Sequence, residues 1–457
     1  MKEEFDIAVL GGGPAGYPAA IRAAQKGARV CVIEKDVLGG TCLNRGCIPT
    51  KVLHAKAHLI ESLKGASISG IKTGSIEIDY SILSSFKTKV VSELVKGIET
   101  LFKSLKIKLI KGYGRLVGDG VIDVEGFGEV KAKRIIVATG SSEMLIPGLE
   151  FDGQVVLSST DLLMLDSLPE SLLIVGGGVI GCEFASIFNA FGVDVTIVEM
   201  LPRLIATEDT QISRAIQTYM KKRGVKVLLG KKVVSIKKDS TGAVVKLESD
   251  EQISCEKVLV SVGRTPNISG AGLEDVGVEI KGGAIVTDRK MRTSVQGIYA
   301  AGDVTGHYLL AHVATREGII SAENATGSET EIDYGAVPVT IYTFPEISRV
   351  GISEDEATSK GIDVKTGRFP FAANGKAKGL GETEGFVKWV ARKEDGRILG
   401  VHVIGPQATE LVASGVVAIQ NELTIEEYVS SIFPHPTLSE SMHESAEAVL
   451  RKAIHLK

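Results

Sequence analysis

The chain has 457 residues, of which 44% are hydrophobic and 24% charged, and this length predicts about three domains of roughly 150 residues. Its formal net charge of −4 excludes a basic field for nucleic acid or anionic lipid, and no apolar run reaches the roughly 18 residues of a membrane span. We therefore expect no nucleic-acid or membrane partner. Five cysteines are too few for a secreted disulfide framework, and with an N-terminus that resembles neither a signal peptide nor a transit segment they predict a cytoplasmic protein.

The first predicted element is an apolar strand that runs into a glycine-rich turn and a helix, FDIAVLGGGPAG at residues 5–16. The turn reads G-x-G-x-x-G, with Gly11, Gly13 and Gly16, and a second apolar strand ends at Glu34. Such glycines permit the tight turn, the approach of a pyrophosphate and close helix packing, while the acid binds a ribose hydroxyl. The helix N-terminus offers the phosphates unpaired N–H groups. The pattern predicts a bound dinucleotide.

Two cysteines, Cys42 and Cys47, follow this unit in GGTCLNRGCIPTK at residues 39–51. Cysteines this close suit a metal clip, a structural disulfide or a redox pair. The other cysteines are Cys31, Cys182 and Cys255. Because a zinc site needs two further Cys or His at ligand spacing, we expect no metal. The position directly after a nucleotide-binding unit favours a dithiol that lies against a bound cofactor.

The strand, glycine turn and helix pattern recurs after a helical region at about 45–107 and a run of short strands. SLLIVGGGVIG contains Gly176, Gly178 and Gly181, and the strand that follows ends at Glu199. The acid follows the last glycine at the same interval in both copies. Two copies predict two dinucleotides, and an acid at position 199 fits the free 2′-hydroxyl of NAD and repels the 2′-phosphate of NADP.

Three other apolar strands end in small-residue turns. RIIVATG ends at Thr139 and Gly140, KVLVSVG ends at Gly263, and GIYAAGD ends at Asp303. Such turns suit the close approach of a cofactor or a crossover of the chain. We expect the second fold to interrupt the first, to which the chain then returns.

From about residue 336 the pattern changes to that of an antiparallel sheet with helices, including a hairpin around Asp395-Gly396. Near the C-terminus, HPTLSE contains His435 and Glu440. Glu440 is placed to hold one imidazole nitrogen so that the other faces a thiol, as a base and its orienting acid do in thiol enzymes. A structural His-Pro turn is the alternative.

These motifs together resemble the pyridine nucleotide–disulfide oxidoreductases over essentially the whole chain. Within the family, CLNRGCIPTK, LAHVATREG and FPHPTLSESMHE are most similar to the branch that oxidises protein-bound dihydrolipoyl groups. Arg45 in the cysteine loop and Pro434 before His435 depart from the usual pattern of that branch.

The resemblance implies FAD on the first glycine motif and Glu34, NAD on the second motif and Glu199, and a redox-active disulfide between the two cysteines. It implies an ion pair of Lys51 and Glu183 near the flavin. It also implies that His435, oriented by Glu440, is the catalytic base. Its further cofactor contacts are Gly40, Thr41, Lys51, Thr139, Gly140, Asp303 and Ala311 for FAD, and Gly263 for NAD.

The fold class that follows is α/β, with two Rossmann-like domains, the second inserted in the first, and a C-terminal α+β dimerisation domain. We expect an FAD-binding domain at 1–145, an NAD-binding domain at 146–265, a second FAD-binding or central part at 266–335 and a dimerisation domain at 336–457. The resemblance implies a homodimer in which His435 of one subunit serves Cys42 of the other.

The partner that the resemblance implies is a lipoyl-bearing protein of a 2-oxo acid dehydrogenase complex or of a glycine-cleavage system. One alternative is a related flavin-dependent NAD(P)H reductase that acts on another small disulfide. A second is a non-catalytic flavoprotein that serves as a structural subunit of a multienzyme complex.

Overall fold

The computed structural model describes residues 4–72, 74–118, 120–240 and 242–456. The chain divides into two compact units, each made of three segments. The first unit comprises Met1–Val52, Ser81–Met144 and Gly263–Asp333, and the second comprises Leu53–Tyr80, Leu145–Val262 and Tyr334–Lys457. The first unit is thus interrupted and later resumed along the chain.

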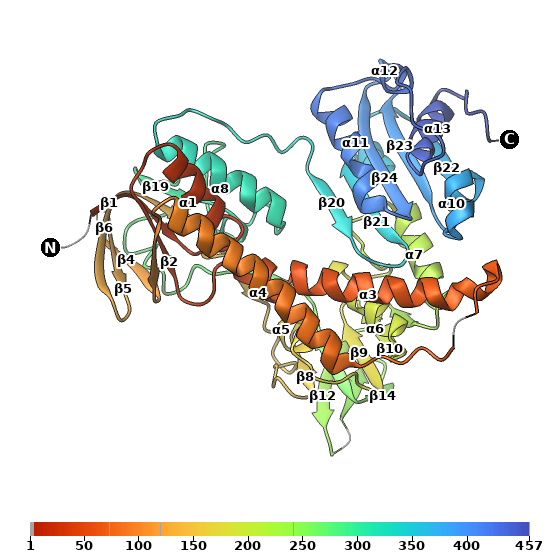
Figure 1. Ribbon diagram of the computed structural model, residues 1–457, viewed down its shortest axis with the longest axis horizontal. Coiled ribbons are helices and arrows are strands. Elements are labelled where there is room, and N and C mark those ends of the chain that lie inside the picture. The colour runs from red at the N-terminus through yellow and green to blue at the C-terminus, as the bar shows by residue number, and fades with distance from the viewer. Residues whose placement is uncertain (1–3, 73, 119, 241, 457) are drawn as a thin grey trace. The chain divides into compact units, whose positions relative to one another are not determined.

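A seven-stranded sheet forms the centre of the first unit (Figure 1). Its strands are β1 (Glu4–Leu10), β2 (Val30–Glu34), β3 (Lys108–Lys111), β4 (Gly114–Gly118), β5 (Val121–Val124), β6 (Gly128–Val137) and β19 (Ile298–Ala300). The order is β3-β2-β1-β6-β5-β4, and β19 pairs with β6 in parallel, with Ile298 opposite Ile135. The predicted return of the chain to its first fold is therefore confirmed.

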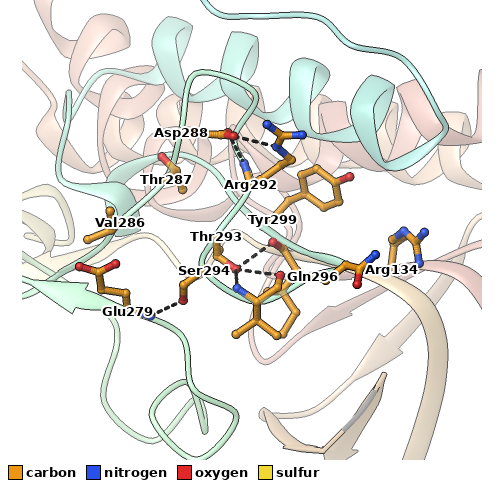
Figure 2. A pocket seen from close by; sticks show the side chains of 13 residues that line it. Arg134, Glu279, Val286, Thr287, Asp288, Arg292, Thr293, Ser294, Gln296 and Tyr299 are labelled. Carbon is orange, nitrogen blue, oxygen red and sulfur yellow. Dashed lines mark hydrogen bonds and ion pairs between the residues drawn. The ribbon is translucent and has the colours of Figure 1, made fainter.

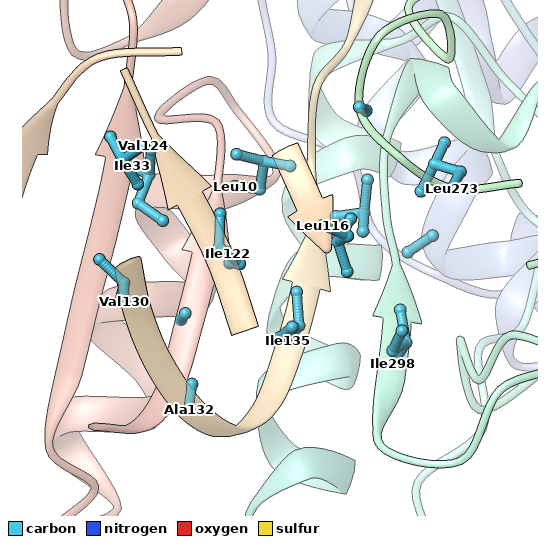
Figure 3. Close-up of a cluster of buried hydrophobic side chains, with 14 of the residues drawn as sticks. Leu10, Ile33, Leu116, Ile122, Val124, Val130, Ala132, Ile135, Leu273 and Ile298 are labelled. Carbon is cyan, nitrogen blue, oxygen red and sulfur yellow. The ribbon is translucent and has the colours of Figure 1, made fainter. Parts of the chain in front are cut away.

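Both faces of this sheet are buried. Along β1, Ala8 and Leu10 belong to one hydrophobic cluster, which Figure 3 shows, while Ile7 and Val9 belong to another on the opposite face. Strands of a parallel sheet covered on both faces read as continuous apolar runs, which is why the first strand lacks polar alternation.

Helices cover this sheet and extend from it. They are α1 (Gly16–Gln25), α2 (Gly40–Arg45), α4 (Tyr80–Ser104) and α8 (Ala311–Ala325), with a 3-10 turn at Asp303–Thr305. Helix α3 (Cys47–Gly65) begins in the first unit, and the rest of it, with the 3-10 turn at Ala66–Ser69, belongs to the second. The helical region predicted at 45–107 corresponds to α3 and α4. Helices α1 and α8 pack closely because Gly318 has no side chain, and a Cβ there would overlap the carbonyl oxygen of Ala15. Two short pairs, β7 (Ser141–Glu143) with β16 (Arg264–Pro266) and β17 (Ile280–Lys281) with β18 (Ala284–Ile285), complete the unit.

A parallel five-stranded sheet in the second unit repeats the arrangement. It has the order β11-β10-β9-β15-β8. Its elements are β8 (Val156–Leu157), α5 (Ser159–Leu163), β9 (Ser171–Val175), α6 (Val179–Ala190), β10 (Asp194–Glu199), α7 (Thr210–Lys222), β11 (Lys226–Leu229) and β15 (Lys257–Val260). An antiparallel sheet of β12 (Val233–Lys238), β13 (Ala243–Leu247) and β14 (Gln252–Cys255) precedes β15.

The C-terminal part of the second unit is an antiparallel sheet in the order β20-β21-β24-β23-β22, drawn in cyan and blue in Figure 1. Its strands are β20 (Pro338–Ile341), β21 (Glu346–Gly351), β22 (Val364–Pro370), β23 (Phe386–Arg392) and β24 (Ile398–Gly405). Its helices are α9 (Glu354–Ser359), α10 (Gly375–Leu380), α11 (Ala408–Gln420), α12 (Ile425–Val429) and α13 (Glu440–Val449), with a 3-10 turn at Phe371–Ala373. The hairpin predicted at Asp395-Gly396 joins β23 to β24.

The predicted fold class is confirmed: the first unit has a mixed sheet whose β3-β2-β1-β6 part and β19 are parallel, the second has a parallel sheet, and the C-terminal part is α+β. The predicted domain boundaries stay predictions. Among the described residues, no helix combines the length and the apolar character needed to cross a membrane.

Candidate active site

The first glycine turn is built so that only glycine fits at two of its three motif positions. Gly11 has a φ of +105°, and a Cβ there would overlap the carbonyl oxygen of Ala138. A Cβ at Gly16 would overlap the carbonyl oxygen of Gly11. At Gly13 a Cβ would meet only Gly40 Cα, at 3.7 Å, so this position leaves space for the close approach of a ligand.

The second glycine turn repeats this geometry. Gly176 has a φ of +107°, and a Cβ there would lie 2.5 Å from the carbonyl oxygen of Ser261. A Cβ at Gly181 would overlap the carbonyl oxygen of Gly176, whereas no described atom lies within 4 Å of one at Gly178. The two motifs are thus alike in shape as well as in sequence.

The acid of each unit is held by the middle glycine of its turn. Glu34 accepts the N–H of Gly12 at 2.7 Å and that of Asp36 at 2.7 Å. Burial raises the pKa of the Glu34 carboxyl above its ordinary value, against the opposing hydrogen bond from Gly12. A carboxylate has about four lone-pair positions, so a ribose hydroxyl still finds an acceptor.

Glu199 is held in the same way. It accepts the N–H of Gly177 at 2.6 Å and that of Leu201 at 2.7 Å. Sequence reasoning singled out the outer glycines of each GGG and missed the middle one. A Cβ added to this middle glycine would lie 2.7 Å from the Leu38 side chain in the case of Gly12, and 2.5 Å from the Leu204 side chain in the case of Gly177. The repeated GGG was the available signal.

The two turns fit dinucleotides because each leads into a helix, α1 or α6, whose N-terminus has no side-chain cap among the described residues. Uncapped first-turn N–H groups and the positive end of the helix dipole suit a pyrophosphate. The space beside Gly13 and Gly178 lets such a group approach the backbone.

The two cysteines are joined as a disulfide that rests on the first glycine turn. Cys42 lies in α2 and Cys47 begins α3, with their Cα atoms 4.7 Å apart, a normal separation for a disulfide. Both are half-buried. A Cβ at Gly40 would lie 2.7 Å from Gly13 Cα, so the cysteine loop packs directly on the turn that the first dinucleotide would occupy.

The loop is braced from within. Asn44 Nδ2 donates to the carbonyl oxygens of Leu38, at 3.0 Å, and Gly40, at 2.9 Å. Arg45 forms an ion pair with Asp36, so its charge is balanced there. Asp36 therefore competes with a cysteine thiolate for the positive charge of Arg45. Lys51 lies one turn beyond Cys47 on α3, on the same helix face.

Asp303 is positioned by residues that return from later in the chain. Ser141 Oγ donates to Asp303 Oδ2 at 2.5 Å, and Arg264 Nε donates to Ser141 Oγ at 2.8 Å. The backbone N–H of Gly302 donates at 2.6 Å to Glu317, which is fully buried in α8. Sequence reasoning missed Ser141, Arg264 and Glu317, although GRTPN and ATREG stood beside predicted site residues.

The small-residue turn that follows β6 is held at the same end of the first sheet as Asp303. Thr139 Oγ1 donates to the carbonyl oxygen of Asn267 at 2.7 Å, and Asn267 N–H donates to the carbonyl oxygen of Gly140 at 2.9 Å. Gly263 accepts the N–H of Met144 at 3.0 Å. Ala311 is the first residue of α8. The structure therefore brings Thr139, Gly140 and Asp303 to one end of the first sheet, while their contacts with cofactors stay predictions.

Glu183 lies in α6 in the second unit and is buried. It accepts the backbone N–H of Tyr342 at 2.9 Å. Its ion pair with Lys51 stays a prediction.

His435 and Glu440 lie in hydrogen-bond contact, while their roles as base and orienting acid stay predictions. His435 Nδ1 donates to Glu440 Oε1 at 2.8 Å, and the Thr437 N–H donates to Glu440 Oε2 at 2.8 Å. Partial burial favours the neutral acid, but the hydrogen bonds from His435 and Thr437 outweigh it and lower the pKa of Glu440. The His435 side chain is 79% exposed, so its other nitrogen is accessible.

A cavity of about 610 Å³ lies elsewhere in the first unit (Figure 2). It contains an ion pair in which Arg292 Nε donates to Asp288 Oδ2 at 2.7 Å. Arg134, Tyr299 and Gln296 also line it, and none of its lining residues is a predicted site residue. Within the part of the chain that the structure describes, no three His, Cys, Asp or Glu side chains cluster as a metal site would require.

Comparisons with known proteins agree with this geometry. The pyridine nucleotide-disulphide oxidoreductase family model matches residues 5–318, and the dimerisation domain of the same family matches residues 337–446. A dihydrolipoyl dehydrogenase of Bacillus subtilis is 43% identical over all of both chains. The mitochondrial dihydrolipoyl dehydrogenase of Pisum sativum is 41% identical over 99% of this chain and 93% of its own.

Solved structures are similar over nearly the whole chain. LpdA of Mycobacterium tuberculosis superimposes with a TM-score of 0.91 at 32% identity, covering 96% of this chain and 98% of its own. The HOCl-induced flavoprotein disulfide reductase RclA of Escherichia coli has a TM-score of 0.88 at 28% identity, covering 97% and 99%.

Proposed function

Because the chain belongs to the pyridine nucleotide-disulphide oxidoreductase family, we propose that it oxidises protein-bound dihydrolipoyl groups to lipoyl groups and reduces NAD⁺ to NADH. The observation that carries this proposal is the Cys42–Cys47 disulfide, which packs on a glycine turn shaped for a dinucleotide. Relatives that match the full chain at about 40% identity are named dihydrolipoyl dehydrogenases.

The residues that would hold the two cofactors are those of the two glycine turns. The first turn with Glu34 would hold FAD, together with Thr139, Gly140 and Asp303. The second turn with Glu199 would hold NAD. When bound, the flavin supplies a two-electron connection between the dithiol and the nicotinamide. The protein orients these groups and shields them from water.

The chain's own residues perform the thiol chemistry. His435 Nε2 removes the proton of one substrate thiol, because only the thiolate is nucleophilic. The thiolate attacks Cys42 Sγ, the Cys42–Cys47 bond breaks, and Cys47 leaves as a thiolate. The second substrate sulfur, whose proton passes to the departing Cys42 Sγ, then attacks the substrate sulfur of the mixed disulfide, which releases the cyclic lipoyl disulfide and leaves both cysteines reduced.

Glu440 has a positioning role in this scheme. Its bond to His435 Nδ1 selects the tautomer with a bare Nε2, and it stabilises the imidazolium that forms. The match to the dimerisation domain supports a homodimer. We infer that His435 of one subunit serves Cys42 of the other.

The partner that we infer is a lipoyl-bearing protein of a 2-oxo acid dehydrogenase complex or of a glycine-cleavage system. We also infer a reducing compartment such as the cytoplasm, where a lasting disulfide is more often catalytic than structural.

The test is the formation of NADH from NAD⁺ and free dihydrolipoamide by the purified flavoprotein. NADP⁺ and glutathione serve as parallel substrates. Rapid turnover with NAD⁺ that is lost in His435→Gln supports the proposal. A second candidate, the reduction of another small disulfide, is favoured by the similarity to RclA. Bleaching of the flavin by NADH without any reaction of dihydrolipoamide would support that candidate instead.

A further inference from the structure

Three basic residues form a row across the C-terminal sheet. Arg349 of β21 lies directly opposite His402 of β24, and His402 lies directly opposite Lys388 of β23. Side chains of directly opposed residues share a face, and this face is packed against α7. His402 is fully buried and Lys388 is 2% exposed. Burial lowers the pKa of His402 to about 4, so this imidazole is neutral at pH 7.

The two cations of the row meet acids at the start of α7. Lys388 Nζ donates to Asp209 Oδ2 at 2.9 Å, and it also forms an ion pair at 2.7 Å with Glu354, the first residue of α9. Arg349 Nε donates to Glu208 Oε1 at 3.0 Å. Glu208 and Asp209 are both buried. A buried charge is costly unless it is paired, so these contacts fix where the start of α7 lies on the sheet.

Asp209 connects the ion pair with Lys388 to helix α7, which begins directly after it. Its other carboxylate oxygen caps α7 by accepting the N–H of Gln211 at 2.8 Å. One carboxylate therefore connects Lys388 to the first turn of α7. A second ion pair, between Lys222 and Glu384, lies at the far end of the same helix and is exposed on the lysine side.

The segment before α7, residues 200–209, forms part of the second dinucleotide turn. Leu201 N–H donates to the ribose-binding acid Glu199. Ile205 N–H donates to the carbonyl oxygen of Gly177 at 2.8 Å, and Leu204 packs over that glycine. The position of this segment therefore sets the shape of the turn and the orientation of Glu199.

One residue of the segment is strained. Ile205 has a φ of +39°, in a region that β-branched residues rarely adopt. Such a conformation persists only where the surrounding structure holds it. The carbonyl oxygen of Ile205 accepts the Glu208 N–H at 2.9 Å, so the anchored acids lie one turn from the strained residue.

We propose that Lys388 and Arg349, on the C-terminal sheet, are positioning residues for the nicotinamide dinucleotide. They hold Asp209 and Glu208, and through them the segment that carries Ile205 and supports Glu199. This inference rests on the proposed function, in which the second glycine turn binds NAD. It assigns to the C-terminal part of the chain a share in binding the nucleotide, through the segment that it holds.

The test compares Lys388→Met with the double variant Asp209→Asn/Lys388→Met in the homodimeric holoenzyme. The single variant leaves Asp209 buried without its cation, so it is expected to lose thermal stability. In the double variant the introduced asparagine still caps α7, and no buried charge is left unpaired there, so much of the melting temperature is expected to return.

We expect the KM for NAD⁺ to rise about tenfold in both variants, with kcat and the KM for dihydrolipoamide within about twofold of the unmodified enzyme. Lys222→Met is the matched control and leaves the KM for NAD⁺ unchanged.

A KM for NAD⁺ that returns to its normal value together with the melting temperature in the double variant would overturn the inference, because the pair would then act only on stability. Equal increases in both KM values would overturn it too. If Lys388→Met does not fold, the double variant decides alone. Failure of the proposed function is distinct, since the unmodified enzyme would then not reduce NAD⁺ with dihydrolipoamide at all.

Discussion

The two glycine turns share their geometry but differ in what covers them. In the first unit, the cysteine loop comes back onto the turn, and Gly40 packs against Gly13. In the second unit, no described atom lies within 4 Å of a Cβ at Gly178. The segment after Glu199 packs on Gly177 but leaves Gly178 uncovered, and it continues to its ion pairs on the C-terminal sheet. A closed turn suits a resident cofactor, and an open turn suits one that exchanges in every cycle.

The difference between the two glycine turns is determined by about ten residues that follow Glu34 in the first unit and Glu199 in the second. After Glu34 the chain forms the loop that contains the two cysteines. After Glu199 it forms the strained segment anchored at Glu208 and Asp209. The same strand, turn and helix thus serve two uses, and the segment that follows the acid selects between them.

The largest effect is expected from removing the chemistry that only the first unit has. Cys47→Ser should lower NADH formation from dihydrolipoamide by about 10³-fold or more, because no disulfide can form. Electron transfer from NADH to an artificial dye should persist, since the second glycine turn and both cofactors remain. Steady-state assays of both reactions measure this separation. Cys255→Ser is the control, and loss of both reactions in Cys47→Ser would contradict the separation of the two halves.

His435→Gln should also affect dihydrolipoamide oxidation and not the reaction of NADH with a dye, and its loss of activity should be smaller than that of Cys47→Ser. Without the base, thiolate formation on the substrate slows, and we expect dihydrolipoamide oxidation to fall about 10²- to 10⁴-fold. The reaction of NADH with a dye needs no such base and should be unchanged. Equal losses in the two assays would show that His435 acts through the structure of the subunit interface.

Gly13→Ala and Gly178→Ala test the closed and open turns directly. A new methyl group at either position finds room in the structure, so both variants should fold. At Gly13 it would occupy the space of the resident cofactor, and the purified protein should contain less flavin. At Gly178 it should leave the flavin content unchanged and raise the KM for NAD⁺ about tenfold, which corresponds to roughly 1.4 kcal/mol. Flavin loss in both variants would contradict the assignment of the two turns.

Local sequence patterns predicted the parts of the site that lie within short segments. The glycine turns, the two acids, the cysteine pair and the His435–Glu440 contact each involve residues within one or two adjacent elements. The supports of the site were not predictable in this way. Arg264 reaches Ser141, and Lys388 reaches Asp209, across more than a hundred residues. A single sequence contains no periodic signal for such pairs, because only the assembled fold brings them together.

The smallest expected effect is a pH dependence that is confined to the oxidation of dihydrolipoamide. The pKa of Glu440 is lowered from 4.5 because the hydrogen bonds from His435 and Thr437 outweigh partial burial. A lowered pKa means that the carboxylate's contribution is present above the ordinary pKa and is lost as the pH falls through the lowered one. The unmodified enzyme should therefore oxidise dihydrolipoamide faster than Glu440→Gln down to about pH 4.5, and this difference in rate should be lost only below that pH. Since Glu440 has no part in the second glycine turn, the ratio of the two enzymes in the reaction of NADH with a dye should stay constant over the same range. A ratio that changes equally in both assays would mean that Glu440 stabilises the whole subunit and does not specifically orient the base.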